Sequence, residues 1–333
     1  MQNSMQYVGF GTRRLSSGIH VMTGCFETRI GGNEFHTHLS AYLACGARGS
    51  ALIDTGHVKD FKKIASYIES VVGKDLTYIF PTHEEYPHSG NLGLLLDAFP
   101  QALVIGETRN LHLYYPDQYR PKRFLQKSVG ERIDLGGRTL EILPALIHDL
   151  PASYWAYDDQ DKTLFVSDGF AFSQYDSAEC ILLSHELPKP TTAAEARLVL
   201  DLALYWSRYA DNAAIVTDLA EMLRKYETRM ICPAHGSVIT EPSKLLAVMD
   251  AALRGEIGVY PPVDGAVAER SDQLVHKVKM DVAAQQIRHW STSPLDDVLV
   301  VLLSQPRLLA SRSSAFSASR RRPHRGATAN LGR

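Results

Sequence analysis

The sequence predicts an α/β fold in which two β-sheets form a sandwich covered by helices. Apolar runs of strand length alternate with segments of helical pattern in each half of the chain, which is typical of that architecture. A chain of 333 residues with 45% hydrophobic content can also fill a core of this size. A third observation concerns chemistry, because several predicted strands are followed directly by His, Asp or Glu.

The predicted elements follow from apolar runs and their periods. Strands are expected near 18–24, 39–45, 49–54, 76–81, 101–105, 138–143, 153–158, 162–167 and 229–232. Helices are expected near 58–72, from His88 onward, and near 191–209 and 211–227. These elements make one main domain, residues 1–250.

The remaining residues predict a different organisation. A mainly helical extension is expected over 251–306, with helices at Asp250–Gly258 and Val275–Trp290 separated by a Tyr-Pro-Pro loop. Residues 307–333 contain seven Arg and no Asp or Glu, which leaves the rest of the chain near −9. We expect this basic tail to be disordered. A solvated terminus is the simplest interpretation, and contact with nucleic acid or an acidic partner is the alternative.

The most informative motif is His83-Glu84-Glu85-Tyr86-Pro87-His88, which follows a predicted strand. It offers imidazole and carboxylate ligands within six residues. Such ligands suit iron, zinc or manganese, and added oxygen donors favour the harder ions. The motif therefore predicts a metal site at a strand end.

Three more candidates, His148, Asp168 and His235, each close or follow an apolar run. A single histidine among the 13 in this chain is more often a surface or hydrogen-bonded residue than a ligand. The ordered set is more specific than any one member. We therefore expect six metal ligands to converge at one sheet edge: His83, Glu85, His88, His148, Asp168 and His235.

This pattern resembles the metallo-β-lactamase superfamily, whose motif is His-x-His-x-Asp-His followed by a distant His, Asp and His. The similarity covers approximately residues 18–245, and Leu52-Ile53-Asp54-Thr55-Gly56 resembles the Asp-Thr-Gly turn of that fold. The resemblance implies a metallo-β-lactamase-like αββα sandwich, here with a short helical C-terminal extension.

Within the superfamily, Glu85 in place of the second histidine resembles flavodiiron proteins and oxygen-binding di-iron proteins, which carry His-x-Glu-x-Asp-His. The helical stretch Ala193–Tyr226 and the following Pro233-Ala234-His235-Gly236 are similar too. The resemblance implies two iron ions as cofactors. Zinc or manganese is the alternative.

Carried over by residue, the resemblance gives metal 1 the ligands His83, Glu85 and His148, and metal 2 the ligands His88 and His235, with Asp168 bridging. Pro87 stands where the family has an Asp for metal 2, and proline has no side-chain donor. Three outcomes remain open. Metal 2 keeps an open position, binds weakly and is lost, or gains a ligand from Glu84 or Tyr86.

Other polar residues near the motif are expected to support the site without binding metal. Asp54 should accept a hydrogen bond from a ligand histidine or from the motif loop. Tyr86 is expected to pack on the loop, with proton donation as the alternative. His38, with His36, precedes a predicted strand and is a candidate for lining the pocket. His57 and His185 do not fit the ligand order.

The resemblance implies binding of dioxygen or a related diatomic and redox chemistry, with electrons from a separate electron-transfer protein. The sequence shows no phosphate-cradling loop, so we expect no flavin site and no flavodoxin domain in this chain. Two alternatives stay open. A binuclear hydrolase would use the ions to activate water, and a non-catalytic sensor would bind oxygen without turnover.

Composition limits the cellular context. Cys25, Cys45, Cys180 and Cys232 form no Cys-x-x-Cys pair, which argues against a disulfide framework or an iron–sulfur cluster. The N-terminus lacks a signal-peptide pattern, and the apolar run Val298–Leu303 is too short to span a bilayer. A cytoplasmic protein without membrane or nucleic-acid partners is expected. The oligomeric state stays open, with a homodimer as one candidate.

Overall fold

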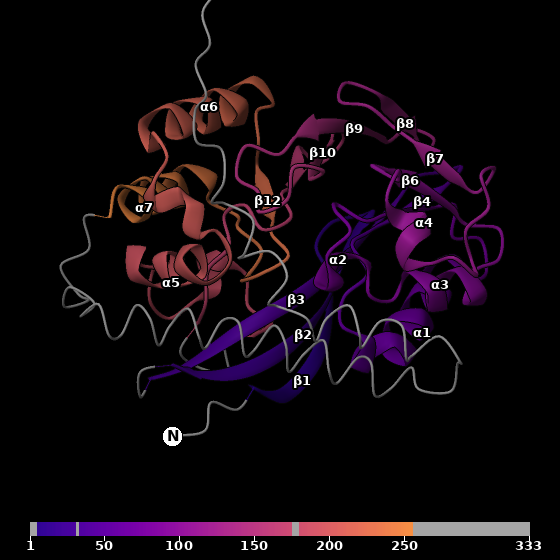
Figure 1. The fold of residues 1–333 in the computed structure, drawn as a ribbon, viewed down its shortest axis with the longest axis horizontal. Helices are drawn as coiled ribbons and strands as arrows, with labels where there is room; N and C mark the ends of the chain where they lie inside the picture. The colour runs from indigo at the N-terminus through magenta and orange to yellow at the C-terminus, as the bar shows by residue number, and fades with distance from the viewer. Residues whose placement is uncertain (1–4, 31–32, 175–179, 256–333) are drawn as a thin grey trace, which may run out of the picture. The chain divides into compact units, whose positions relative to one another are not determined.

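The computed structural model describes residues 5–30, 33–174 and 180–255. The basic tail and nearly all of the helical extension predicted from the sequence lie outside the described residues. The described part contains two β-sheets and the helices that cover them (Figure 1).

The first sheet contains seven strands within the described residues. Their order is β1 (Met5–Arg14), β2 (Ile19–Ile30), β3 (Asn33–Cys45), β4 (Ser50–Ile53), β5 (Tyr78–Phe80), β6 (Leu103–Gly106) and β7 (Phe124–Gln126). Strands β1 to β4 pair antiparallel, and β4 to β7 pair parallel. The carboxyl ends of β4 and β5 therefore lie at the same edge.

The second sheet has the order β12 (Met230–Cys232), β11 (Thr163–Phe165), β10 (Tyr154–Asp158), β9 (Thr139–Pro144) and β8 (Arg132–Asp134). Only β11 and β12 pair parallel among these strands of the described chain. Their carboxyl ends thus also share one edge, where Asp168 and His235 follow.

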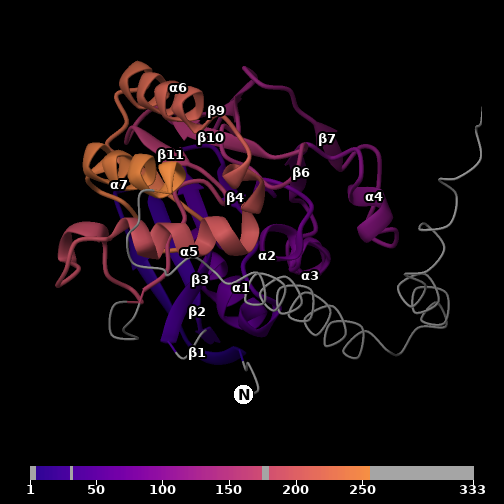
Figure 2. The ribbon, with the colours of Figure 1, turned by 60° about the vertical axis from the view of Figure 1, so that its left-hand side comes forward.

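Helices cover the outer faces. They are α1 (Phe61–Val72), α2 (Tyr86–Ser89), α3 (Leu92–Ala98), α4 (Leu111–Tyr114), α5 (Ala193–Ala203), α6 (Asn212–Lys225) and α7 (Pro242–Arg254), with 3₁₀ turns η1 (Val58–Asp60), η3 (Ser184–Glu186) and η4 (Tyr205–Arg208). The turned view shows α5, α6 and α7 grouped on one side of the sheets (Figure 2).

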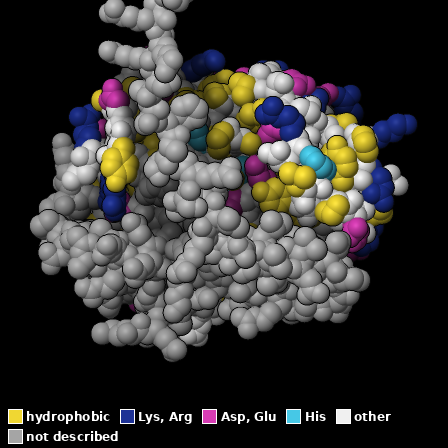
Figure 3. All heavy atoms as spheres, viewed as in Figure 1, with side chains coloured by type: hydrophobic (Ala, Val, Ile, Leu, Met, Phe, Trp, Pro, Cys, Tyr) yellow, Lys and Arg dark blue, Asp and Glu magenta, His cyan; other side chains and the backbone are white. Residues whose placement is uncertain are grey.

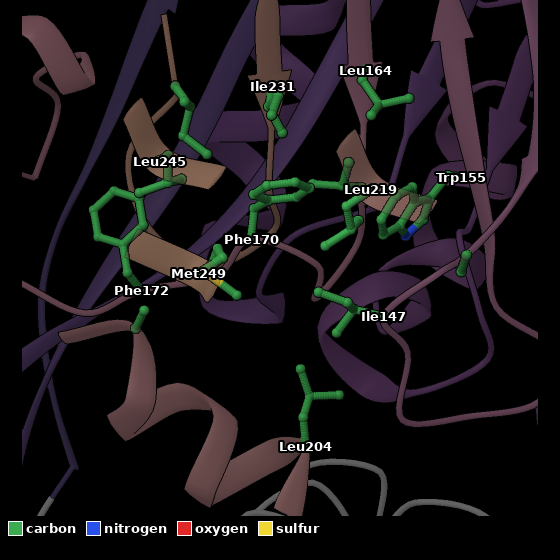
Figure 4. Packing of buried hydrophobic residues seen from close by; sticks show 14 of the residues in the cluster. Ile147, Trp155, Leu164, Phe170, Phe172, Leu204, Leu219, Ile231, Leu245 and Met249 are labelled. Carbon is green, nitrogen blue, oxygen red and sulfur yellow. The ribbon is translucent and has the colours of Figure 1, made fainter. Parts of the chain in front are cut away.

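Three apolar clusters define four layers. Ile64 and Ile68 of α1 pack with α3 against the first sheet, and Phe165 lies among the residues between the two sheets. On the outer face of the second sheet, side chains of β10, β11 and β12 meet those of α6 and α7 around Phe170 (Figure 4). The predicted αββα sandwich is therefore confirmed.

Local signals explain the helix limits. Thr192 and Glu195 form a capping box that starts α5, and Asp211 accepts from Ala213 N–H to start α6. Gly73, with φ +63°, ends α1 in a conformation that side chains disfavour. The helix predicted over 191–209 is interrupted at Leu204, where the backbone leaves the helical region and η4 begins.

Several elements differ from the sequence prediction. Strand β1 and the three-residue strands β7 and β8 were not predicted, and the helix expected from Asp250 begins earlier, at Pro242, and ends at Arg254. Strand β3 begins at Asn33, so His36 and His38 lie inside it instead of preceding a strand. Short strands have too few alternating positions to show a period, and β1 and β3 gain their length by pairing with β2.

The part of the surface that is visible in Figure 3 carries side chains of mixed character. On the face in Figure 3, basic and acidic side chains lie close together among apolar ones.

Within the residues that the structure describes, no helix combines the length and apolar character needed to cross a membrane.

Arg138 provides a test of how the two sheets are joined. Its guanidinium is 1% exposed, lies 2.7 Å from the carboxylates of Asp158 and Asp161, and donates to the carbonyl of Cys45 at the end of β3. Arg138→Leu should lower the free energy of unfolding by about 3–5 kcal/mol, because it leaves the buried Asp158 carboxylate without its cation. Urea denaturation of the variant and the parent measures this difference.

Arg132→Leu is the matched control. Arg132 pairs with Glu141 and Asp159, but its side chain is 55% exposed. Its loss should change the free energy of unfolding by no more than about 1 kcal/mol. Equal effects of the two substitutions would contradict the proposed importance of the buried pair.

Candidate metal centre

Strand ends from both sheets bring the candidate side chains together. Asp54 follows β4, His83 follows β5, Asp168 follows β11 and His235 follows β12. Ligand sites in sheets with parallel strands commonly lie beyond the carboxyl ends of those strands. The four residues are separated by long stretches of sequence and meet because these strand ends meet.

Asp168 is at the centre of the cluster. Its Oδ1 lies 3.2 Å from Nε2 of His88 and 3.1 Å from Nε2 of His235, whereas its Oδ2 lies 3.7 Å from Nε2 of His83. The two oxygens of one carboxylate thus face different imidazoles. This arrangement suits a carboxylate that bridges two cations.

The Oδ2 side of the cluster contains two more carboxylates. Nε2 of His83 lies 3.8 Å from Glu85 Oε2 and 3.8 Å from Asp149 Oδ1. Ligand atoms of His83, Glu85 and Asp149 all lie within 4.8 Å of one another, as do those of His83, His88 and Asp168. The two groups share His83, so they form one continuous centre.

Hydrogen bonds at Nδ1 orient the imidazoles. Nδ1 of His88 lies 2.9 Å from Oδ2 of Asp54, and Nδ1 of His235 lies 2.7 Å from the carbonyl of His38. An acceptor at Nδ1 favours the tautomer whose Nε2 carries a lone pair, which is the form that binds metals. The predicted hydrogen bond between Asp54 and a motif histidine is confirmed.

The third imidazole is held by hydroxyls. Nδ1 of His83 lies 3.1 Å from Oγ of Ser153 and 3.2 Å from Oγ of Ser167. Its Nε2 therefore also points to the side where the carboxylates gather.

Unpartnered atoms test whether these residues fit a metal. Nε2 of His83 and of His88, Oδ1 of Asp149 and Oδ2 of Asp168 are buried and have no hydrogen-bond partner of normal geometry. Buried polar atoms usually have one. Buried nitrogen and oxygen atoms that face one another in this way match the donor set of a divalent cation, so these residues fit a binuclear metal centre.

The electrostatics of the cluster reflect crowded negative charge. Burial and then the charge of Asp168 raise the pKa of Asp149 to about 7. The nearby imidazole of His83 lowers the pKa of Glu85 to about 2. Burial opposes the charge of His88, but the carboxylates of Asp54 and Asp168 outweigh it and hold the pKa of His88 well above its ordinary value.

Two residues of the centre have left-handed backbone. Asp54 has φ 57° and Ser167 has φ 52°, each directly after a strand or one residue beyond it. This conformation costs about 1–3 kcal/mol for residues other than glycine and often occurs at functional sites. At Asp54 it is held by the hydrogen bond from its own N–H to the carbonyl of Phe80.

His148 is the predicted ligand that the structure does not bring to the other five. Its Nδ1 bonds the carbonyl of Ala145 at 2.8 Å, and its ring lies 6.3 Å from that of Trp206. Its neighbour Asp149 lies in the cluster instead, because adjacent side chains in this loop point in different directions. Sequence reasoning missed Asp149, although a carboxylate next to a predicted ligand was the available signal.

The other polar candidates have local roles. The Tyr86 hydroxyl accepts from Val58 N–H, and its ring packs edge-on against His57. Glu84 is in neither of the two ligand groups that share His83. His185 bonds the hydroxyl of Thr240, away from the ligand order.

Comparisons with known proteins identify the family of this chain. A family model described as ODP family beta lactamase matches residues 37–236. Coenzyme F420H(2) oxidase of Methanothermobacter marburgensis is 29% identical over 258 residues, which cover 70% of this chain and 59% of the oxidase. This chain therefore matches less than two thirds of that relative's length.

Solved structures show the same fold. Rubredoxin oxygen:oxidoreductase from Desulfovibrio gigas superimposes with a TM-score of 0.61 at 20% identity, covering 74% of this chain and 62% of that one. The Flv1 flavodiiron core from Synechocystis gives 0.60 at 19% identity, covering 75% and 62%. Since the family model spans more than half of the sequence, this chain belongs to the family described as ODP family beta lactamase.

Proposed function

We propose that this protein holds two iron ions in the cluster around Asp168 and carries out redox chemistry on dioxygen or a related diatomic, with electrons from a separate donor. The observation that carries the proposal is the position of Asp168, whose two oxygens face different imidazoles. The carboxylate of Glu85 adds a hard donor to one side and favours iron. The similarity to an oxidase of coenzyme F420H(2) supports an oxidoreductase.

We assign His83, Glu85, Asp149 and Asp168 to one ion, and His88, His235 and Asp168 to the other. The family pattern instead gives the first ion His148. Bound iron would supply the exchange of electrons with a diatomic ligand. The chain's own contribution is to fix three imidazoles through Asp54, the His38 carbonyl and the two serines, and to keep water away from the largely buried cluster.

The identity of the metal and its reactivity test the proposal directly. Full-length protein reconstituted anaerobically with ferrous iron alone should bind two ions per chain, and its absorption spectrum should change when oxygen is added. Asp168→Ala should bind neither ion, because the shared negative charge is lost. Metal analysis of the folded variant measures this.

Asp134→Ala is the control, because this carboxylate is 60% exposed on β8 and outside the cluster. It should bind two ions like the parent. Zinc that stays bound during iron reconstitution, with no oxygen-dependent spectral change, would reject the redox proposal and favour the hydrolase.

A pair of neighbouring variants distinguishes the two assignments of the first ion. Asp149→Ala should lower the affinity for that ion by at least about tenfold, since even residues that only support a ligand contribute this much to metal affinity. His148→Ala should leave it nearly unchanged. Iron titration of both variants distinguishes the two ligand assignments. If His148→Ala weakens binding of the first ion more than Asp149→Ala does, His148 is a ligand of that ion.

Pro87 tests the second ion, which has one carboxylate fewer than the family pattern. Pro87→Asp should add an oxygen donor and raise the affinity for this ion. The substitution also frees the backbone at the start of α2, which costs about 0.4–1 kcal/mol. Pro87→Ala is the matched control, because it frees the backbone without adding a donor. If the Asp variant binds the second ion no more tightly than the Ala variant, the missing-ligand explanation fails.

A further inference from the structure

A second group of ligand-type side chains includes one residue of strand β2 and one of strand β3. Cys25 of β2 is directly opposite His38 of β3 in the antiparallel register. Directly opposed residues project their side chains from the same face of a sheet. Cys180, which lies between β11 and β12 in the sequence, lies against this pair.

The three side chains are close and mostly buried. Their ligand atoms all lie within 4.8 Å of one another. Cys25 is 3% exposed and His38 is 1% exposed, whereas Cys180 is half-buried. His38 and Cys180 also line a cavity of about 10 Å³, roughly the size that holds one water molecule or ion.

An unsatisfied nitrogen indicates a ligand. Nε2 of His38 is buried and has no hydrogen-bond partner among the described residues. A disulfide between the two cysteines would leave this nitrogen without a partner. A metal ion bound by all three side chains would satisfy it.

The donor set selects the class of metal. Two sulfurs and one imidazole suit zinc, with ligand atoms at about 2.0–2.3 Å from the ion and therefore about 3.5–3.8 Å from one another in tetrahedral geometry. The observed separations need only small side-chain movements to reach this. The oxygen-rich cluster around Asp168 has the opposite preference, for harder ions.

We propose that Cys25, His38 and Cys180 form a zinc site separate from the carboxylate-rich centre. Three protein ligands leave a fourth position for water or another donor. The site has a direct connection to the first centre, because the carbonyl of His38 accepts the hydrogen bond that orients His235. A zinc ion on the His38 side chain would therefore also fix the strand that positions His235.

Cobalt(II) substitution tests the proposal with a signature that the carboxylate-rich centre cannot give. Reduced, metal-free, full-length protein titrated with cobalt alone should develop a thiolate-to-cobalt charge-transfer band that saturates at one ion per chain. The band should persist in Asp168→Ala and disappear on addition of zinc. The cobalt result therefore does not depend on whether the proposed iron centre exists.

Cys25→Ser, Cys180→Ser and His38→Gln should each lose the band or weaken cobalt binding at least tenfold. Cys45→Ser is the control, because Cys45 is also a free, half-buried cysteine of β3 but is outside the group. Absence of a thiolate band in the reduced parent would overturn the proposal. A band lost in Cys45→Ser but kept in Cys25→Ser would overturn it equally.

Discussion

The carboxylate of Asp54 accepts hydrogen bonds from both the N–H and the hydroxyl of Thr82, and it also lies beside Nδ1 of His88. Because the Thr82 hydroxyl gives its only proton to Asp54, its oxygen can accept the hydroxyl of Ser167 at 2.9 Å. Ser167 follows β11, whereas Asp54 and Thr82 follow β4 and β5. This small buried network therefore connects the ends of the two sheets at the point where the ligand side chains begin.

The network explains how the side chains of the carboxylate-rich centre are positioned. Asp54 requires a left-handed backbone, and its hydrogen bonds offset that strain. The same residue orients His88, so backbone geometry and ligand geometry depend on one side chain. Removing water from such a cluster strengthens every charge interaction in it, which makes a bound cation the natural partner of the crowded carboxylates.

Two kinds of coordination chemistry are thus available within a short distance in this protein. The centre around Asp168 offers oxygen and imidazole donors, whereas the group on β2 and β3 offers thiols and one imidazole. His38 belongs to both through different atoms, since its side chain faces the cysteines and its carbonyl orients His235. Strand β3 therefore links the two places.

The sequence by itself predicted the αββα architecture and placed His83, Glu85, His88, Asp168 and His235 at strand ends, because apolar periodicity and residue order are local properties of the chain. It also predicted the hydrogen bond of Asp54. Only the tertiary structure showed that Asp149 lies in the cluster and His148 does not, since the direction of a side chain in an irregular loop depends on distant contacts such as that with Trp206. The meeting of Cys25, His38 and Cys180 was likewise invisible in the sequence, because it depends on the pairing register of β2 with β3 and on a segment more than 140 residues away.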